Sequence, residues 1–182
     1  MDATRQPATV ADQLAAVAEL HALAERHGTD YWLFGGWAVD FHAGRVTREH
    51  ADVDVAIWAA DADRVAALLA ARGWTHRAEA GEDGYTAYAR GDVRLEVAFL
   101  ARGADGCVFT PLRDGRGTWP DGSFSADVLT LRGVRARVVA RTALVAEKSV
   151  VRADPVTAAK DRADVASLGA PGASPDSARA FP

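Results

Sequence analysis

Residues 34–58, FGGWAVDFHAGRVTREHADVDVAIW, are unusual for an ordinary globular segment. Asp52 and Asp54 stand two residues apart inside an apolar run, although aspartate is among the poorest strand formers. Upstream, Gly35 and Gly36 occupy positions where a bulky side chain would pack better. The stretch is therefore either a surface strand with a polar face or part of an active site.

The two aspartates point the same way if this segment is a strand. Successive side chains alternate between faces, so the valines and Ile57 share one face and Asp52 and Asp54 the other. By the same parity, DVRLEVAFL at 92–100 puts Glu96 on a polar face. If the strands are neighbours, three carboxylates converge and need cations between them. Oxygen ligands without His or Cys predict Mg²⁺. The alternative is a half-exposed strand on which Glu96 pairs with Arg94.

The glycine pair adds a second feature to this pattern. Two glycines that follow a buried strand and open a helix let backbone N–H groups approach phosphates closely. The basic stretch RVTREH, 45–50, separates them from the aspartates. Glycines, basic residues and Asp-x-Asp in this order are typical of a site for nucleotide phosphates and Mg²⁺.

The rest of the chain predicts a mixed α/β (α+β) domain with a helical C-terminal end. Thr9 and Asp12 form an approximate capping box before a helix that Gly28 ends. Asp61 is expected to cap another helix, and residues 103–123, rich in Gly and Pro, are expected to be a loop. Tight turns at Gly91-Asp92 and Arg132-Gly133 predict two hairpins. Helices are expected over about 141–152 and 156–168.

Composition limits the domain count and the function classes. The 182 residues suit one main domain at 1–140, helices at 141–168 packed on it, and a disordered tail at 169–182. A net charge of -4 argues against binding duplex nucleic acid. The single Cys107 excludes a disulfide framework and a cysteine zinc site. No apolar run approaches the ~20 residues of a membrane span. We expect a cytoplasmic protein without a membrane partner, and leave monomer and homodimer open.

The basic residues are unevenly chosen. Of the 21, 19 are arginines, and the lysines are Lys148 and Lys160. Either these two positions need a compact, flexible ammonium, or the choice is chance.

These motifs together resemble the nucleotidyltransferase superfamily typified by DNA polymerase beta. More narrowly, GGWAVDFHAGRVTREHADVDV, 35–55, is similar to antibiotic nucleotidyltransferases. The similarity is greatest to aminoglycoside 2''-O-adenylyltransferases, with lincosamide nucleotidyltransferases as neighbours. The resemblance implies a polymerase-beta-like mixed sheet with flanking helices.

The resemblance also implies a role for each site residue. Asp52, Asp54 and Glu96 would be the catalytic carboxylates and the ligands of two Mg²⁺ ions. Nucleotide contacts would come from Gly35, Gly36, Arg48, His50 and, more weakly, Lys148. For His50 a phosphate contact and a local hydrogen bond are both open. Two departures, Glu96 where aminoglycoside enzymes tend to have Asp, and Ala51 where an acid often precedes the pair, put the substrate in doubt.

The implied reaction is transfer of a nucleoside monophosphate from an NTP, expected to be ATP, to a hydroxyl of a small molecule, first an aminoglycoside. An acidic region (Glu79, Glu82, Asp83, Glu96) could receive a polycation, and several aromatic residues (Trp74, Tyr85, Tyr88, Trp119) could stack on a sugar or lie in the core. The alternatives are a lincosamide acceptor, a toxin-like enzyme acting on protein or tRNA, a nucleotide-binding module without turnover, and a structural domain.

Overall fold

The computed structural model describes residues 8–77 and 84–169. Within these ranges no helix is long and apolar enough to span a bilayer. The elements, in chain order, are α1 (Val10–His27), β1 (Tyr31–Leu33), α2 (Gly35–Ala43), β2 (Val53–Trp58), a short 3-10 turn (Ala59–Asp61), α3 (Ala62–Ala70), β3 (Thr75–Arg77), β4 (Tyr85–Arg90), β5 (Val93–Arg102), β6 (Val108–Leu112), β7 (Gly115–Thr118), β8 (Val128–Leu131), β9 (Val134–Arg137), α4 (Arg141–Lys148) and α5 (Pro155–Gly169).

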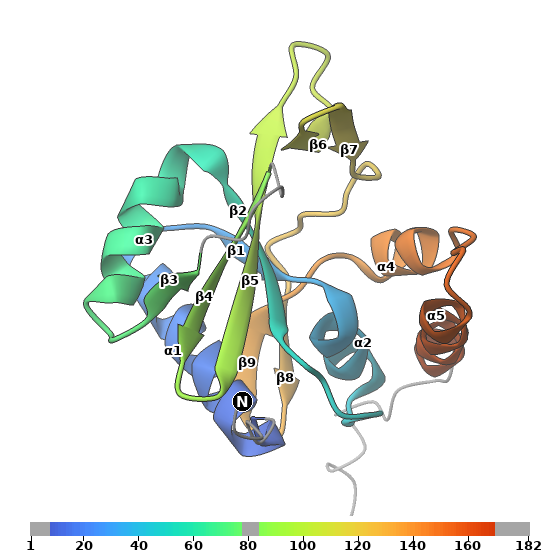
Figure 1. Cartoon of the computed structure of the whole chain (residues 1–182), viewed down its shortest axis with the longest axis horizontal. Helices are drawn as coiled ribbons and strands as arrows, with labels where there is room; N and C mark the ends of the chain where they lie inside the picture. Colours follow the sequence, from blue (N-terminus) through green and yellow to red (C-terminus); the bar gives the residue numbers. More distant parts are fainter. Residues whose placement is uncertain (1–7, 78–83, 170–182) are drawn as a thin grey trace, which may run out of the picture.

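The architecture is the mixed sheet with flanking helices that the sequence predicts. The main sheet runs β1-β2-β5-β4-β3, and β2 and β5 are parallel while the other pairs are antiparallel. The helices α1 and α3 lie on one side of the sheet, and α2, α4 and α5 gather on the other (Figure 1). The helix α5 packs against both α2 and α4. This second side is where the polar strand faces point.

The hydrophobic core follows from strand parity. Val53, Val55, Leu95 and Val97 are all 2% exposed or less, because they share the apolar face of β2 and β5. The predicted hairpins are observed between β4 and β5 and between β8 and β9. Thr9 and Asp12 form the expected capping box at the start of α1.

Three local predictions differ from the structure. The expected loop at 103–123 contains the strands β6 and β7, which pair with each other, and β6 also pairs with the end of β5. Pro111 and two glycines made this hairpin look like a loop, yet the pairing of β6 with β5 covers only Val108 and Phe109, so Pro111 lies beyond it. The helix expected at 141–152 ends at Lys148. Asp61 is the N-cap residue of α3 but makes no side-chain capping bond.

The predicted division at 140/141 stays a prediction. Its helical part corresponds to α4 and α5. The tail predicted to be disordered lies outside the described residues, apart from Gly169, which ends α5.

Candidate active site

The glycine pair begins α2 directly beside the predicted carboxylates. Gly35 has φ +63°, and a Cβ there would lie 2.0 Å from Oδ2 of Asp54. A Cβ on Gly36 would lie 2.4 Å from Nδ1 of His50 and 2.5 Å from a terminal nitrogen of Arg48. Side chains are therefore excluded at both positions by the close approach of site residues. The predicted contact of these glycines with phosphate stays a prediction.

Three carboxylates converge, as the parity of the strands predicts. The parallel register of β2 and β5 pairs Asp54 with Glu96, and Asp52 immediately precedes β2. One oxygen from each of the three residues lies within 4.8 Å of the other two. We call Asp52, Asp54 and Glu96 the carboxylate cluster.

The electrostatics of the cluster favour a bound cation. Burial, together with the charges of Asp52 and Glu96, raises the pKa of Asp54 to about 8, against the opposing effect of Lys160 and Lys148. Without a cation, Asp54 therefore holds a proton at neutral pH. The donors are all hard oxygens, which Mg²⁺ prefers. Arg94 does pair with Glu96, with its Nε 2.9 Å from Oε1, so the predicted alternative partner and the cluster coexist.

His50 and Arg48 lie together behind the glycines. Arg48 donates to Nδ1 of His50 at 2.9 Å. Since that nitrogen must accept, Nε2 carries the proton and donates to Oδ2 of Asp40 at 2.7 Å. Asp40 also accepts from the backbone N–H and the hydroxyl of Thr47. The local hydrogen bond foreseen for His50 is thus present, and its phosphate contact stays a prediction.

Lys148 belongs to a partly buried group of alternating charges. Its ammonium lies 3.0 Å from Asp164 and 3.3 Å from Asp161, and Asp164 also receives both Nε and a terminal nitrogen of Arg48 at 3.1 Å. The full set, which we call the ion-pair network, is Arg48, Glu147, Lys148, Arg152, Asp161 and Asp164. Its three cations balance its three acids.

Protonation states within the network follow from these contacts. Burial opposes ionisation of Asp164, but the hydrogen bonds from Arg48 and Lys148 hold its pKa below the usual range. Burial likewise opposes the charge on Lys148, yet Glu147, Asp164 and Asp161 raise its pKa. Sequence reasoning missed Asp161 and Asp164. Their spacing with Leu168, which is typical of a buried helix face, was the available signal.

An open pocket of about 340 Å³ lies on the same side of the sheet as the cluster. Tyr85 pairs with Ala98, two residues from Glu96, so its side chain shares the face of Glu96. The lining residues are Phe34, Tyr85, Thr110, Gly117, Thr118, Trp119, Pro120, Ala146, Glu147 and Val150. Two of the four aromatic residues for which stacking and core packing were both open therefore line this pocket.

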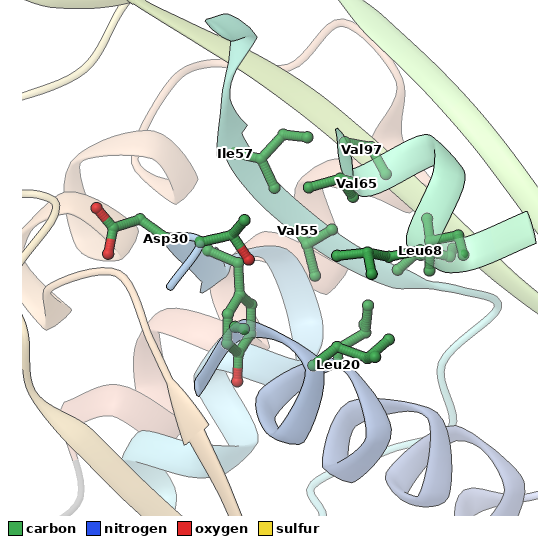
Figure 2. Close-up of a pocket in the computed structure, with 13 residues that line it drawn as sticks. Leu20, Asp30, Val55, Ile57, Val65, Leu68 and Val97 are labelled. Carbon is green, nitrogen blue, oxygen red and sulfur yellow. The ribbon is translucent and has the colours of Figure 1, made fainter. Parts of the chain in front are cut away.

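The other two aromatic candidates for acceptor contacts lie elsewhere. Trp74 and Tyr88 are core residues, 4% and 7% exposed. The acids Glu79, Glu82 and Asp83 lie outside the described residues. A second cavity, of about 30 Å³, lies between the opposite face of the sheet and the helices α1 and α3 (Figure 2). Its labelled lining is apolar except for Asp30. It is a small gap in the core packing, away from the carboxylate cluster.

The mixed sheet, the glycine turn and the carboxylate cluster define the nucleotidyltransferase class. The chain belongs to the aminoglycoside-2''-adenylyltransferase family, whose model matches residues 16–168.

Individual relatives are similar over shorter stretches. A 2''-aminoglycoside nucleotidyltransferase of Klebsiella pneumoniae and one of Escherichia coli are each 40% identical over 43 residues. The match spans 24% of this chain and 24% of each of these curated relatives.

Solved structures show the same fold at low identity. The lincosamide antibiotic adenylyltransferase LnuA, lincomycin-bound, superposes with a TM-score of 0.69 at 19% identity, over 90% of this chain and 98% of LnuA. ANT(2'')-Ia in complex with adenylyl-2''-tobramycin gives 0.67 at 22% identity, over 86% of this chain and 90% of that chain.

Proposed function

We propose that this protein transfers AMP from ATP to a hydroxyl of an aminoglycoside antibiotic, in a Mg²⁺-dependent reaction in the cytoplasm. The observation that carries the proposal is the carboxylate cluster on parallel neighbouring strands, with the glycine start of α2 against Asp54. Family membership supports the same chemistry and the same acceptor class.

The cluster has the donors that two Mg²⁺ ions require, and its oxygens lie close enough to share them. Bound there, the ions would stabilise charge on the α-phosphate and on the leaving pyrophosphate. Asp54 faces this site from β2, Asp52 from the position just before β2, and Glu96 from β5.

Glu96 is the residue best placed to act on the acceptor. It shares its sheet face with Tyr85 of the pocket, so an acceptor seated in the pocket brings a hydroxyl toward it. The acceptor oxygen forms a bond to the α-phosphorus, the bond to the β-phosphate oxygen breaks, and the proton of the hydroxyl passes to Glu96. The pair with Arg94 fixes the orientation of the Glu96 carboxylate.

A lincosamide is a second candidate acceptor. The pocket wall includes Phe34, Tyr85, Trp119 and Val150, and Glu147 is the acidic residue of its described lining. An apolar and aromatic wall with one carboxylate suits an acceptor that has an apolar face and few positive charges.

Mass spectrometry of reaction mixtures tests both candidates. The protein is incubated with Mg²⁺, each NTP in turn, and a panel of aminoglycosides and lincosamides. We expect an acceptor whose mass grows by one adenylyl group, which is AMP less water, and no such product with Asp54→Asn. Product with lincosamides alone would favour the second acceptor. No product in any pair would overturn the proposal.

A further inference from the structure

Arg48 and Lys148 are the two cations that the sequence predicts to contact the triphosphate. Both already pair with acids of the protein. Arg48 donates its Nε and one terminal nitrogen to Asp164, and its other terminal nitrogen to His50 and to the carbonyl of Glu49. Four of the five guanidinium N–H groups are thus occupied. Lys148 is 7% exposed and has three carboxylates within 4.0 Å. If either cation moved to a phosphate, a buried carboxylate would lose that cation as its partner.

The second lysine of the chain is in a different situation. Lys160 is an exposed residue of α5. Among residues 8–77 and 84–169 it makes no hydrogen bond and no ion pair. The two lysines therefore differ: the ammonium of Lys148 is paired with carboxylates, and that of Lys160 is available to a ligand.

The position of Lys160 on α5 directs it toward the site. It lies four residues before Asp164, which places both on one side of the helix, one turn apart. Asp164 contacts Arg48, and Arg48 lies against Gly36 at the start of α2. This flank of α5 therefore borders the glycine turn. In agreement, α5 packs directly against α2, the helix that begins at the glycine pair.

We propose that Lys160 binds the phosphates of the nucleotide that leave as pyrophosphate, while Lys148 holds α4 and α5 together. The assignment rests on the proposed function for its ligand. A lysine suits this place because its four-carbon stem lets the ammonium follow the phosphates as they depart. Fixed positive charge at a developing anion is the kind of stabilisation that speeds phosphoryl chemistry.

The test compares Lys160→Gln with the matched variant Arg162→Gln. Arg162 is an exposed cation two positions along the same helix, about 200° around it, so its loss removes the same net charge from another side. Titration calorimetry with ATP at saturating Mg²⁺ measures affinity, and initial rates give KM and kcat. We expect Lys160→Gln to lower the affinity for ATP and for inorganic pyrophosphate by about 10- to 100-fold, the usual range for a charged hydrogen bond. Arg162→Gln should match the wild type, and Lys160→Arg should retain part of the affinity.

A second readout separates phosphate binding from a purely electrostatic effect on Asp54. Removing a nearby cation should strengthen binding of Mg²⁺ alone in either case. If Lys160→Gln changes only this Mg²⁺ affinity and leaves the affinity for ATP and pyrophosphate unchanged, the assignment is overturned although the proposed function stands. If the wild type binds no Mg-nucleotide at all, the proposed function fails first and the role of Lys160 fails with it. Melting temperatures equal to the wild type confirm that each variant is folded.

Discussion

Replacing Gly35 by alanine perturbs the carboxylate cluster through one added methyl group. The Cβ of alanine would lie 2.0 Å from Oδ2 of Asp54, whereas ordinary contact starts near 3.4 Å. The carboxylate oxygen must therefore retreat by about 1.4 Å, or the start of α2 must shift by as much. Since the three cluster oxygens share a site only 4.8 Å across, a movement of this size disrupts the ligand set.

The cost has two parts of different kinds. Alanine in the left-handed region costs about 1–2 kcal/mol of stability, which for a chain of this size lowers Tm by a few degrees. The displacement of Asp54 affects the site rather than the fold. A misplacement of about 1 Å can cost ~100-fold in rate, so we expect kcat/KM to fall at least that far. We expect Mg²⁺ affinity to fall about tenfold or more.

Gly44→Ala is the matched control. Gly44 has φ +68°, close to the +63° of Gly35, but a Cβ there meets nothing within 4 Å. Both variants carry the same backbone strain, and only Gly35→Ala displaces Asp54. Thermal melts with increasing Mg²⁺ report affinity through ligand-dependent stabilisation, and initial rates report turnover. Equal Mg²⁺ responses and equal rates in the two variants would refute the role of close approach at Gly35.

Three further substitutions test the electrostatics and the pocket. With a chelator present, wild-type stability should decline as pH rises from about 4 to about 8, because folding raises the pKa of Asp54 from 3.8 to about 8. In denaturant titrations Asp54→Asn should abolish this decline. The free energy of unfolding of the variant, relative to the wild type, should therefore rise across that pH window and be constant outside it. Lys148→Met should cost about 3 kcal/mol or more by leaving Asp161 and Asp164 without their shared cation, measured by chemical denaturation. Trp119→Ala should raise the KM for the acceptor severalfold and leave ATP affinity unchanged, and the reverse pattern would remove Trp119 from the acceptor pocket.

The carboxylate cluster could be predicted because its information is local. Strand parity places Asp54 and Glu96 on polar faces, and one further condition, that β2 and β5 are neighbours, brings them together. That condition came from the resemblance rather than from periodicity. The two hairpins could also be predicted, because each depends on a Gly-containing turn within one contiguous stretch of sequence.

The ion-pair network could not be predicted in the same way. Arg48 and Asp164 are 116 residues apart, and nothing in the sequence near either residue indicates the other. An arginine beside a glycine turn has the chemistry to bind phosphate, and only the tertiary structure shows that an acid of α5 already occupies it. The same holds for Lys148 and Lys160, which sequence composition singles out equally. The three carboxylates around Lys148 distinguish it from Lys160, which pairs with none of the described residues.

The charges around the site indicate the form in which the nucleotide binds. The ion-pair network is neutral as a whole, so it offers no net attraction to a polyanion. The carboxylate cluster carries two or three negative charges, depending on the proton on Asp54. With Arg94 paired to Glu96 and the ammonium of Lys160 included, the local charge is still zero or negative, so a bare triphosphate would meet no net attraction there. Divalent ions must therefore arrive before or with the nucleotide and displace that proton, so ATP affinity should depend steeply on Mg²⁺. Equal ATP affinity in chelator and in excess Mg²⁺, measured by calorimetry, would contradict this coupling.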